Sequence, residues 1–391
     1  MSRSVSPQID GDDRAFLRKR RRPSYDGANP VRIVDLFSGC GGLTLGLAEA
    51  SRAVQRGIDV RLAAEWDPEI WDVYTANFTP VRPHISSDVR QWFDGKVGAR
   101  RTNREISTRR AVGPVDFLVG GPPCQGHSSL NNHTRNRDPK NVLYERMVRA
   151  AEVLMPDQVI IENVPSLRRD ASGVLERSVD RLERLGYSVS HRVFRLVELG
   201  VAQLRARHVL VATTANRTHP PLTTPPPLRA ARTLRWAIGD LSAGSSVFET
   251  AGELTGENKA RARWLLDHNE YDLPNARRPP CHRDPSHKYK SMYGRLDWDK
   301  PAQTITTGFG SPGQGRYLHP AEARTLTPHE AARIQFFPDW FDFSNVTKRR
   351  LLQEMIGNAV PPKLGFLVGL DLLSHVVSVA AGGPPTRAAA R

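Results

Sequence analysis

The stretch VRIVDLFSGCGGL, residues 31–43, decides the fold class of this chain. Its first seven residues are mostly apolar and predict a buried strand. The glycines that follow predict a tight turn, and small residues through Ala50 predict a helix. In such a strand–turn–helix unit the backbone passes very close to a ligand, although the glycines do not have the GxGxxG spacing of dinucleotide-binding proteins.

The same alternation continues along the chain. Further apolar stretches predict strands at residues 60–64, 115–119, 158–161 and 208–212, with helices notably at 142–155 and 175–185. Strands that alternate with helices form a mostly parallel sheet that is covered on both faces. We therefore expect an α/β fold with a Rossmann-like sheet.

Composition divides the chain into parts. The expected parts are a flexible basic tail (1–29), a sheet domain (30–214), a smaller domain (215–350), a return to the sheet domain (351–380) and a C-terminal tail (381–391). The N-terminal part is polar and carries the basic run Arg18–Arg22, which cannot bury a core. A solvated tail is the simpler interpretation of this run, and a phosphate-binding arm is the alternative.

Charge and cysteine content narrow the class of protein. The chain has 56 Lys and Arg residues against 41 Asp and Glu, a net charge of +15, which favours a polyanionic partner. Cys40, Cys124 and Cys281 have no CxxC pairing and no metal-ligand spacing, so neither a disulfide framework nor a metal site is expected. Because no run of about 20 apolar residues and no apolar leader occurs, we expect no membrane contact and a cytoplasmic location.

Two acidic residues are candidates for binding a nucleoside. Glu65 follows the second predicted strand, about 20 residues beyond the glycine turn, where doubly wound folds bind ribose hydroxyls. The adjacent Trp66 offers an aromatic face to an adenine ring, and Asp88 is a candidate for the adenine amino group. The pattern predicts a nucleoside-containing cofactor.

Reactive side chains are expected at the ends of other strands. The sequence GGPPCQG, residues 120–126, follows an apolar strand and exposes Cys124 on a rigid loop. Glu162 ends the next strand and would lie beside the cysteine at the same edge. Arg205 and Arg207 lead into a further strand, and alternation would make both point the same way.

Methylation of cytosine at carbon 5 would need these residue types. Carbon 5 is a poor nucleophile until a thiolate adds to carbon 6 and converts the ring into an enamine, which can attack a sulfonium methyl group. A carboxylic acid that protonates or hydrogen-bonds N3 makes this addition feasible. An arginine at O2 stabilises the charge that develops there.

Six motifs in order resemble those of the DNA cytosine-5 methyltransferase family. They are FSGCGG (37–42), PPCQ (122–125), ENV (162–164), QLRAR (203–207), RTLTPHEAARIQFFP (324–338) and GNAVPP (357–362). With the flanking elements they span Val31 to about Leu372. The resemblance implies a Rossmann-like S-adenosylmethionine-dependent methyltransferase sheet, in the catalytic and cofactor-binding domain, with a smaller target-recognition domain.

The resemblance also implies roles for individual residues. Cys124 would be the nucleophile, Glu162 would contact N3 and Arg207 would contact cytosine O2, while Arg205 would support the site. S-adenosylmethionine is the implied methyl donor. The residues implied for its pocket are Phe37, Gly39, Gly41, Gly42, Leu43, Glu65, Trp66, Asp88, Val89, Pro122, Leu143, Asn358, Ala359 and Val360. His127 departs from the aromatic residue usual in the family, and we expect this substitution to be neutral.

Double-stranded DNA is the implied partner. The target cytosine must leave the duplex to reach Cys124, at a cost of a few kcal/mol. In the family, a variable segment, here about residues 217–317, recognises the sequence. The candidate DNA contacts are Arg135, Arg137, Lys140, Arg277, Arg278, Arg283, Lys288 and Lys290. We expect a monomer, acting alone or beside a cognate restriction endonuclease.

Three other functions compete with this interpretation. A tRNA cytosine-5 methyltransferase would share the fold and chemistry, but the Cys-Phe-Thr sequence of that relative is absent. A catalytically inactive DNA-binding regulator is disfavoured by the presence of Cys124, Glu162 and Arg207. A Rossmann dehydrogenase is disfavoured by the missing GxGxxG motif.

Overall fold

The computed structural model describes most of the chain in two compact units. The described residues are 7–79, 86–123, 141–170, 172–214, 231–242, 244–283 and 291–380, with the backbone alone at 7–11, 141–142 and 375–380. One unit, here called the sheet unit, comprises Pro23–Phe194, Ala206–Pro225 and Val360–Arg391. The other, here called the second unit, comprises Met1–Arg22, Arg195–Arg205 and Pro226–Ala359.

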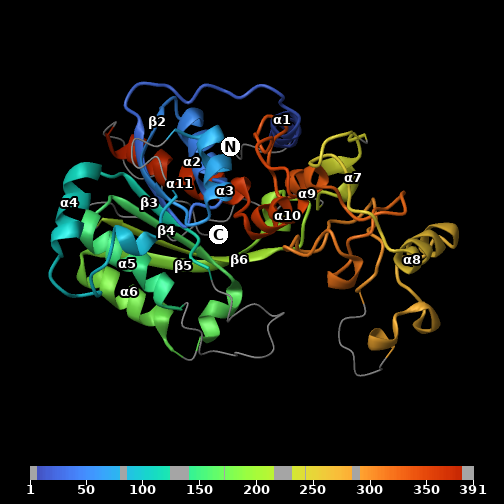
Figure 1. Ribbon diagram of the computed structural model, residues 1–391. Coiled ribbons are helices and arrows are strands. Elements are labelled where there is room, and N and C mark those ends of the chain that lie inside the picture. The colour runs from blue at the N-terminus through green and yellow to red at the C-terminus, as the bar shows by residue number, and fades with distance from the viewer. Residues whose placement is uncertain are drawn as a thin grey trace, which may run out of the picture. The chain divides into compact units, whose positions relative to one another are not determined.

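The sheet unit is built on a six-stranded mixed sheet (Figure 1). Its strands, in spatial order, are β2 (Ile58–Ala64), β1 (Val31–Leu36), β3 (Phe117–Gly120), β4 (Gln158–Asn163), β6 (Ala206–Thr214) and β5 (Tyr187–Arg195). β1 pairs in parallel with β2 and β3, β3 pairs in parallel with β4, and β6 is antiparallel to β4. The predicted α/β class is therefore confirmed. β5 was not predicted, because only its first and eighth residues are buried.

Helices cover both faces of this sheet (Figure 1). On one face lie α2 (Gly42–Ala53) and α11 (Pro362–Ala380), on the other lie α4 (Asn103–Val112), α5 (Asn141–Leu154) and α6 (Val174–Arg184), and α3 (Pro68–Asn77) follows β2. The packing of α2 on α11 depends on glycine, because a Cβ at Gly46 would lie 2.5 Å from the Phe366 nitrogen. With both faces covered, polar groups of the central strands are accessible to a ligand mainly at the strand ends.

The second unit is helical and rich in loops. It contains α1 (Pro7–Leu17), α7 (Leu234–Ile238), α8 (Gly256–Asp267), α9 (Pro328–Ile334) and α10 (Arg349–Asn358). Short 3-10 helices in the two units are η1 (Val89–Gln91), η3 (Pro165–Arg169), η4 (Leu196–Leu199), η5 (Asn275–Arg277), η6 (Pro280–His282) and η7 (Pro312–Gln314). Its described residues include isolated β-bridges that do not extend into strands, such as the bridge between Gln203 and Ala302. We infer that side-chain contacts hold the second unit together more than hydrogen bonds between paired strands do.

The units divide the chain differently from the expected domains. The second unit extends to Ala359, whereas its expected end was residue 350. α10 crosses that expected boundary, and its first residue, Arg349, donates to the Thr250 carbonyl oxygen at 3.2 Å and to Thr250 Oγ1 at 2.9 Å. A continuous helix anchored in this way belongs to one unit.

The N-terminal segment also differs from the expected flexible tail. α1 is helical, and the Leu17 side chain is fully buried. Phe16 stacks on Phe336 at a ring-centroid distance of 5.9 Å, and Asp13 pairs with Arg232 at 2.6 Å. These partners are far away in sequence, so the local composition could not indicate that this segment packs against the rest of the second unit.

The described residues contain neither a membrane span nor a metal cluster. None of the helices there is long and apolar enough to cross a membrane. No group of three or more His, Cys, Asp and Glu side chains among them is arranged to hold a metal ion.

Candidate active site

The glycine-rich turn after β1 has an unusual backbone. Phe37, Gly39 and Gly41 have φ values of 58°, 53° and 96°, in the left-handed region. A bulky residue rarely adopts this conformation, which costs on the order of 1–3 kcal/mol. Gly41 is also required sterically, because a Cβ there would lie 2.7 Å from the Phe78 ring. The turn leads directly into α2, in which Gly42 and Leu43 are buried.

Glu65 brings three segments together beside this turn. Its carboxylate accepts hydrogen bonds from the backbone nitrogens of Gly39 and Asp67, both at 3.0 Å. Its carbonyl oxygen accepts from the Ser87 nitrogen at 2.6 Å, which places Asp88 close by in sequence. Burial raises the pKa of Glu65, although the backbone hydrogen bonds oppose this shift.

The other predicted cofactor residues of the sheet unit differ in exposure. The Trp66 side chain is 73 % exposed, as an aromatic face open to a ligand would be. Asp88 accepts from the Arg90 nitrogen at 2.8 Å, and the Arg90 side chain lowers the pKa of Asp88. Val89 is buried, and Leu143 is half-buried on α5.

Asp35, which the sequence analysis did not single out, lies in β1 just before this turn. Its carboxylate accepts from Thr44 Oγ1 at 2.6 Å, and that hydroxyl is 3.0 Å from the Tyr74 hydroxyl. Burial raises the pKa of Asp35 to about 7. The sequence pattern that could have identified Asp35 is a single acidic residue inside an otherwise mostly apolar strand.

Glu162 and Arg207 lie together at the ends of β4 and β6. Arg207 Nε is 2.6 Å from Glu162 Oε1, and both side chains are largely buried. Burial lowers the pKa of Arg207, and the adjacent carboxylate opposes that shift. A Cβ at Gly121 would lie 3.2 Å from Glu162 Oε2 and 3.3 Å from Val360 Cγ2. The carboxylate therefore adjoins the loop that leads to Cys124.

Asn163 holds the same loop. Its Nδ2 donates to the Pro122 carbonyl oxygen at 3.1 Å, and its Oδ1 accepts from the Val164 nitrogen at 2.7 Å. Gly120 leaves no room for a side chain, because a Cβ there would lie 2.4 Å from the Leu36 carbonyl oxygen. Asn163 lies in the motif ENV, but the sequence predicts no role for it, since its contact depends on the tertiary structure.

Several predicted residues lie outside the described part of the chain. They are Cys124, His127, Arg135, Arg137, Lys140, Lys288 and Lys290. The other two cysteines are described: Cys40 is buried and Cys281 is exposed. Burial raises the pKa of the Cys40 thiol to about 12, which makes it a poor candidate for a nucleophilic thiolate.

Arg205 has a different environment from Arg207, contrary to the expectation that both point the same way. β6 begins at Ala206, so strand alternation does not extend to Arg205. In the second unit, Arg205 Nη1 donates to the carbonyl oxygens of Ile305 at 2.8 Å and Gly357 at 2.9 Å. These contacts make Arg205 a residue that positions backbone segments.

Other motif residues of the second unit extend this network. Gln203 Nε2 donates to Gln335 Oε1 at 2.8 Å, and Gln203 Oε1 accepts from the Ile305 nitrogen at 2.9 Å. Gln335 Nε2 donates to the Ile356 carbonyl oxygen at 2.6 Å. The network thus holds the segment before Asn358 and Ala359, two predicted cofactor residues. Asn358 is exposed and Ala359 is buried.

The described candidates for DNA contact lie in one segment of the second unit. The Arg277 guanidinium lies over the Trp264 ring at 5.4 Å. Arg278 donates to the Leu273 carbonyl oxygen at 3.0 Å, and Arg283 donates to the Arg278 carbonyl oxygen at 2.7 Å. Each arginine thus has at least one contact within the unit, and Arg277 and Arg283 are exposed.

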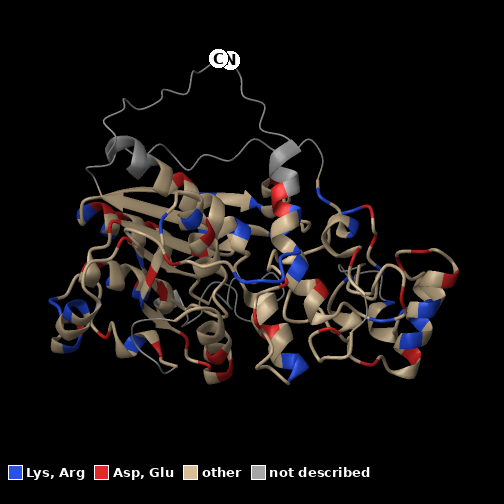
Figure 2. Cartoon of the chain, turned by 90° about the horizontal axis from the view of Figure 1, so that it is seen from above, with Lys and Arg blue, Asp and Glu red and all other residues tan. Residues whose placement is uncertain are grey.

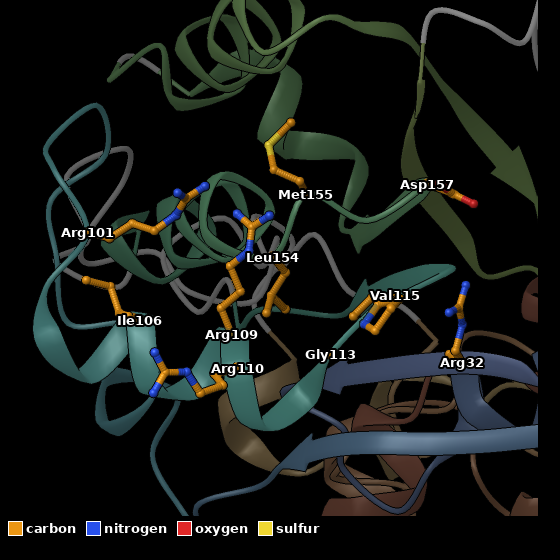
Figure 3. Close-up of a pocket in the computed structure, with 11 residues that line it drawn as sticks. Arg32, Arg101, Ile106, Arg109, Arg110, Gly113, Val115, Leu154, Met155 and Asp157 are labelled. Carbon is orange, nitrogen blue, oxygen red and sulfur yellow. The ribbon is translucent and has the colours of Figure 1, made fainter.

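The sheet unit also has a cavity away from these residues (Figure 3). Its volume is about 640 Å³, and its lining includes Arg32, Val115 and Asp157, which lie at or just before the starts of β1, β3 and β4. Arg101 and Arg109 also line it, and their side chains donate to the Glu152 and Val153 carbonyl oxygens at the end of α5. The cavity is therefore at the opposite end of the strands from Glu162.

Comparison with known proteins identifies the family. The model of the C-5 cytosine-specific DNA methylase family matches residues 31–373. The type II methyltransferase M1.BsuMI of Bacillus subtilis (strain 168) is 43% identical over 92% of this chain and 85% of its own length. The type II methylase M.HgiDII of Herpetosiphon aurantiacus is 33% identical over 87% of this chain and 94% of its own.

Solved structures show the same fold. A methyltransferase encoded within a prophage (E. coli) has a TM-score of 0.62 at 22% identity, covering 89% of this chain and 99% of its own. A variant of DNMT2 from Spodoptera frugiperda has a TM-score of 0.58 at 16% identity, with the same shares covered. Taken with the family match, the chain belongs to the C-5 cytosine-specific DNA methylase family and is a DNA cytosine-5 methyltransferase.

Proposed function

We propose that this methyltransferase transfers a methyl group from S-adenosylmethionine to carbon 5 of a flipped cytosine in a specific DNA sequence, through a covalent adduct between Cys124 and carbon 6. The observation that carries this proposal is the buried pair of Glu162 and Arg207 beside Gly121, three residues before Cys124. An acid and a cation at 2.6 Å, next to the loop of a cysteine, match the requirements for activating a cytosine ring.

Each side chain of this site has one role in the reaction. The Cys124 thiolate forms a bond to carbon 6 while Glu162 donates a hydrogen bond or proton to N3. Arg207 stabilises the negative charge that develops at O2. After methyl transfer, the proton on carbon 5 leaves to a base and the carbon–sulfur bond breaks, which regenerates the thiolate. Asn163 holds Pro122 and thereby orients the cysteine loop.

The residues around the glycine-rich turn fit S-adenosylmethionine. Ser38 Oγ is buried there and makes no hydrogen bond within the described structure, so it is available to a polar ligand. Carboxylate oxygens can each accept a further hydrogen bond, which lets Glu65 bind ribose hydroxyls as well as backbone nitrogens. Trp66 would stack on adenine, and Asp88 would accept from the adenine amino group. When bound, the cofactor supplies the electrophilic methyl group.

The substrate and its context follow from the family and from charge. The net charge of +15 suits double-stranded DNA, and Arg277, Arg278 and Arg283 are the described candidates for contacting it. The candidates outside the described residues, including Arg135 and Lys288, would add phosphate contacts. The enzyme would act as a cytoplasmic monomer, and the type II names of its relatives favour pairing with a cognate restriction endonuclease.

A covalent trap tests the mechanism. In a duplex whose target cytosine is replaced by 5-fluorocytosine, carbon 5 carries no removable proton after methyl transfer, so wild type should remain attached to the DNA. Cys124→Ser should trap no DNA and lose turnover, because an alcohol is a far weaker nucleophile at neutral pH. Calorimetry with S-adenosylhomocysteine should show that this variant still binds cofactor. Trapping by Cys124→Ser, or loss of trapping in Cys281→Ser, would contradict the assignment.

A further inference from the structure

The basic run that precedes β1 is held at both ends. Lys19, Arg20, Arg21 and Arg22, here called the basic segment, follow α1 and form part of a covalent connection between the two units. All four side chains are exposed. Figure 2 shows a run of basic residues where the chain leaves α1.

The first anchor lies in the second unit. Arg18 donates to the Trp236 carbonyl oxygen at 3.0 Å and pairs with Asp240 at 2.5 Å. The Leu17 carbonyl oxygen accepts from the Asp339 nitrogen at 2.9 Å. The residues immediately before the basic segment are therefore fixed to the unit by both side chain and backbone.

The second anchor lies in the sheet unit. Tyr25 is 7% exposed, and its hydroxyl donates to Glu49 Oε1 at 2.8 Å. The Tyr25 carbonyl oxygen accepts from the Ile58 nitrogen at 3.0 Å. Only Pro23 and Ser24 separate this anchor from Arg22, so little chain lies between the basic segment and a residue held by the sheet unit.

Some exposed arginines of the chain have acidic partners, unlike the first three cations of the basic segment. Arg90 and Arg235 pair with acidic neighbours, at 2.5 Å and 3.1 Å. Within the described part of the chain, no carboxylate lies within 4.0 Å of the cationic groups of Lys19, Arg20 or Arg21. Adjacent like charges repel one another, and a polyanion relieves that repulsion.

We propose that the basic segment binds the phosphate backbone of the DNA substrate. Because the flanking residues are already anchored, DNA does not have to order a long floppy arm, and most of the electrostatic gain appears as affinity. Backbone contacts carry no sequence information, so the segment strengthens binding to every duplex. This inference rests on the proposed function for the identity of the polyanion.

Salt dependence of DNA binding tests the inference. The variant K19Q/R20Q/R21Q/R22Q removes four charges while leaving both anchors intact. The slope of log K against log salt, measured from about 50 to 200 mM salt, should become shallower by about 0.9 for each phosphate that the variant no longer neutralises. Affinity at the low end of this range should fall at least about tenfold, and equally for duplexes with and without the target sequence.

Two further variants control for charge and for folding. R20K/R21K/R22K keeps the cations and should retain the wild-type slope. K96Q/R100Q/R104Q/R110Q removes four exposed cations from in and around α4 of the sheet unit and should change the slope much less. Thermal melting of each variant checks that the fold is kept.

The outcomes separate this inference from the proposed function. An unchanged slope in the four-glutamine variant, or an equal change in the α4 control, would overturn it. Loss of binding to anionic lipid vesicles with unchanged DNA affinity would also overturn it, in favour of a membrane surface. Absence of methylation by wild type would instead contradict the proposed function.

Discussion

Arg205 and Arg207 belong to one motif, are separated by a single residue and have different surroundings. Arg207, in the sheet unit, pairs with a carboxylate at 2.6 Å beside the cysteine loop. Arg205, in the second unit, donates to two backbone carbonyl oxygens. Under the proposed function, the motif contains one side chain for the reaction and another that holds the chain.

The same contrast separates the two units more widely. In the sheet unit, the polar groups proposed for the reaction follow strands whose positions are fixed by backbone pairing. In the second unit, Gln203, Gln335 and Arg205 themselves hold segments that have at most isolated bridges in the described residues. Substitutions in the first set should therefore change the rate, and substitutions in the second should change stability.

Arg207→Ala should have the larger effect of the two arginine substitutions. Removing a charge that stabilises the developing oxyanion should lower the methylation rate about 10²–10³-fold. Single-turnover methylation with saturating DNA measures this loss, and Arg207→Lys, which keeps a charge, should lose less. A wild-type methylation rate in Arg207→Ala would show that Arg207 does not contribute to the reaction.

Arg205→Ala should instead act on stability. Two buried carbonyl oxygens lose a donor and a cavity is left, so the free energy of unfolding should fall by about 2–4 kcal/mol. Denaturant unfolding checks the value, and the rate per folded molecule should fall less than in Arg207→Ala. Because Gln203 bonds to the same segment around Ile305, the effects of Gln203→Ala and Arg205→Ala should not be additive. Additive effects on the free energy of unfolding would show that Gln203 and Arg205 stabilise the protein independently.

The periodicity of the sequence was sufficient to predict the position of Glu162 in this site. Glu162 follows an apolar run, and runs of this kind form parallel strands whose carboxyl ends share an edge. Its place beside the loop before Cys124 therefore followed from local pattern alone. The orientation of Arg205 did not, because the strand begins at Ala206, just after Arg205, and the partners of Arg205 come from around residues 305 and 357.

Contacts between segments distant in sequence explain the remaining differences. α1 and the following Arg18 have the composition of a solvated tail, yet their partners Arg232 and Asp240 lie more than 200 residues away. The contact between Asn163 and Pro122, and the left-handed backbone of Phe37, likewise depend on how the loops pack. Such features need the assembled sheet, which a single sequence does not provide.

The last prediction is the pH dependence of stability conferred by Asp35. Its pKa in the folded protein is about 7, above the roughly 3.9 of an unfolded chain, so the native state keeps a proton that the unfolded state has released. The stabilisation is therefore complete below about pH 4 and is lost as the pH rises through 7, by at most about 1.4 kcal/mol per pH unit. Asp35→Asn, which resembles the protonated acid, should remove this slope. Thr44→Val should move it to higher pH, because the Thr44 hydrogen bond lowers the pKa. Urea unfolding at a series of pH values measures both variants, and a wild-type slope in Asp35→Asn would assign the titration to another group.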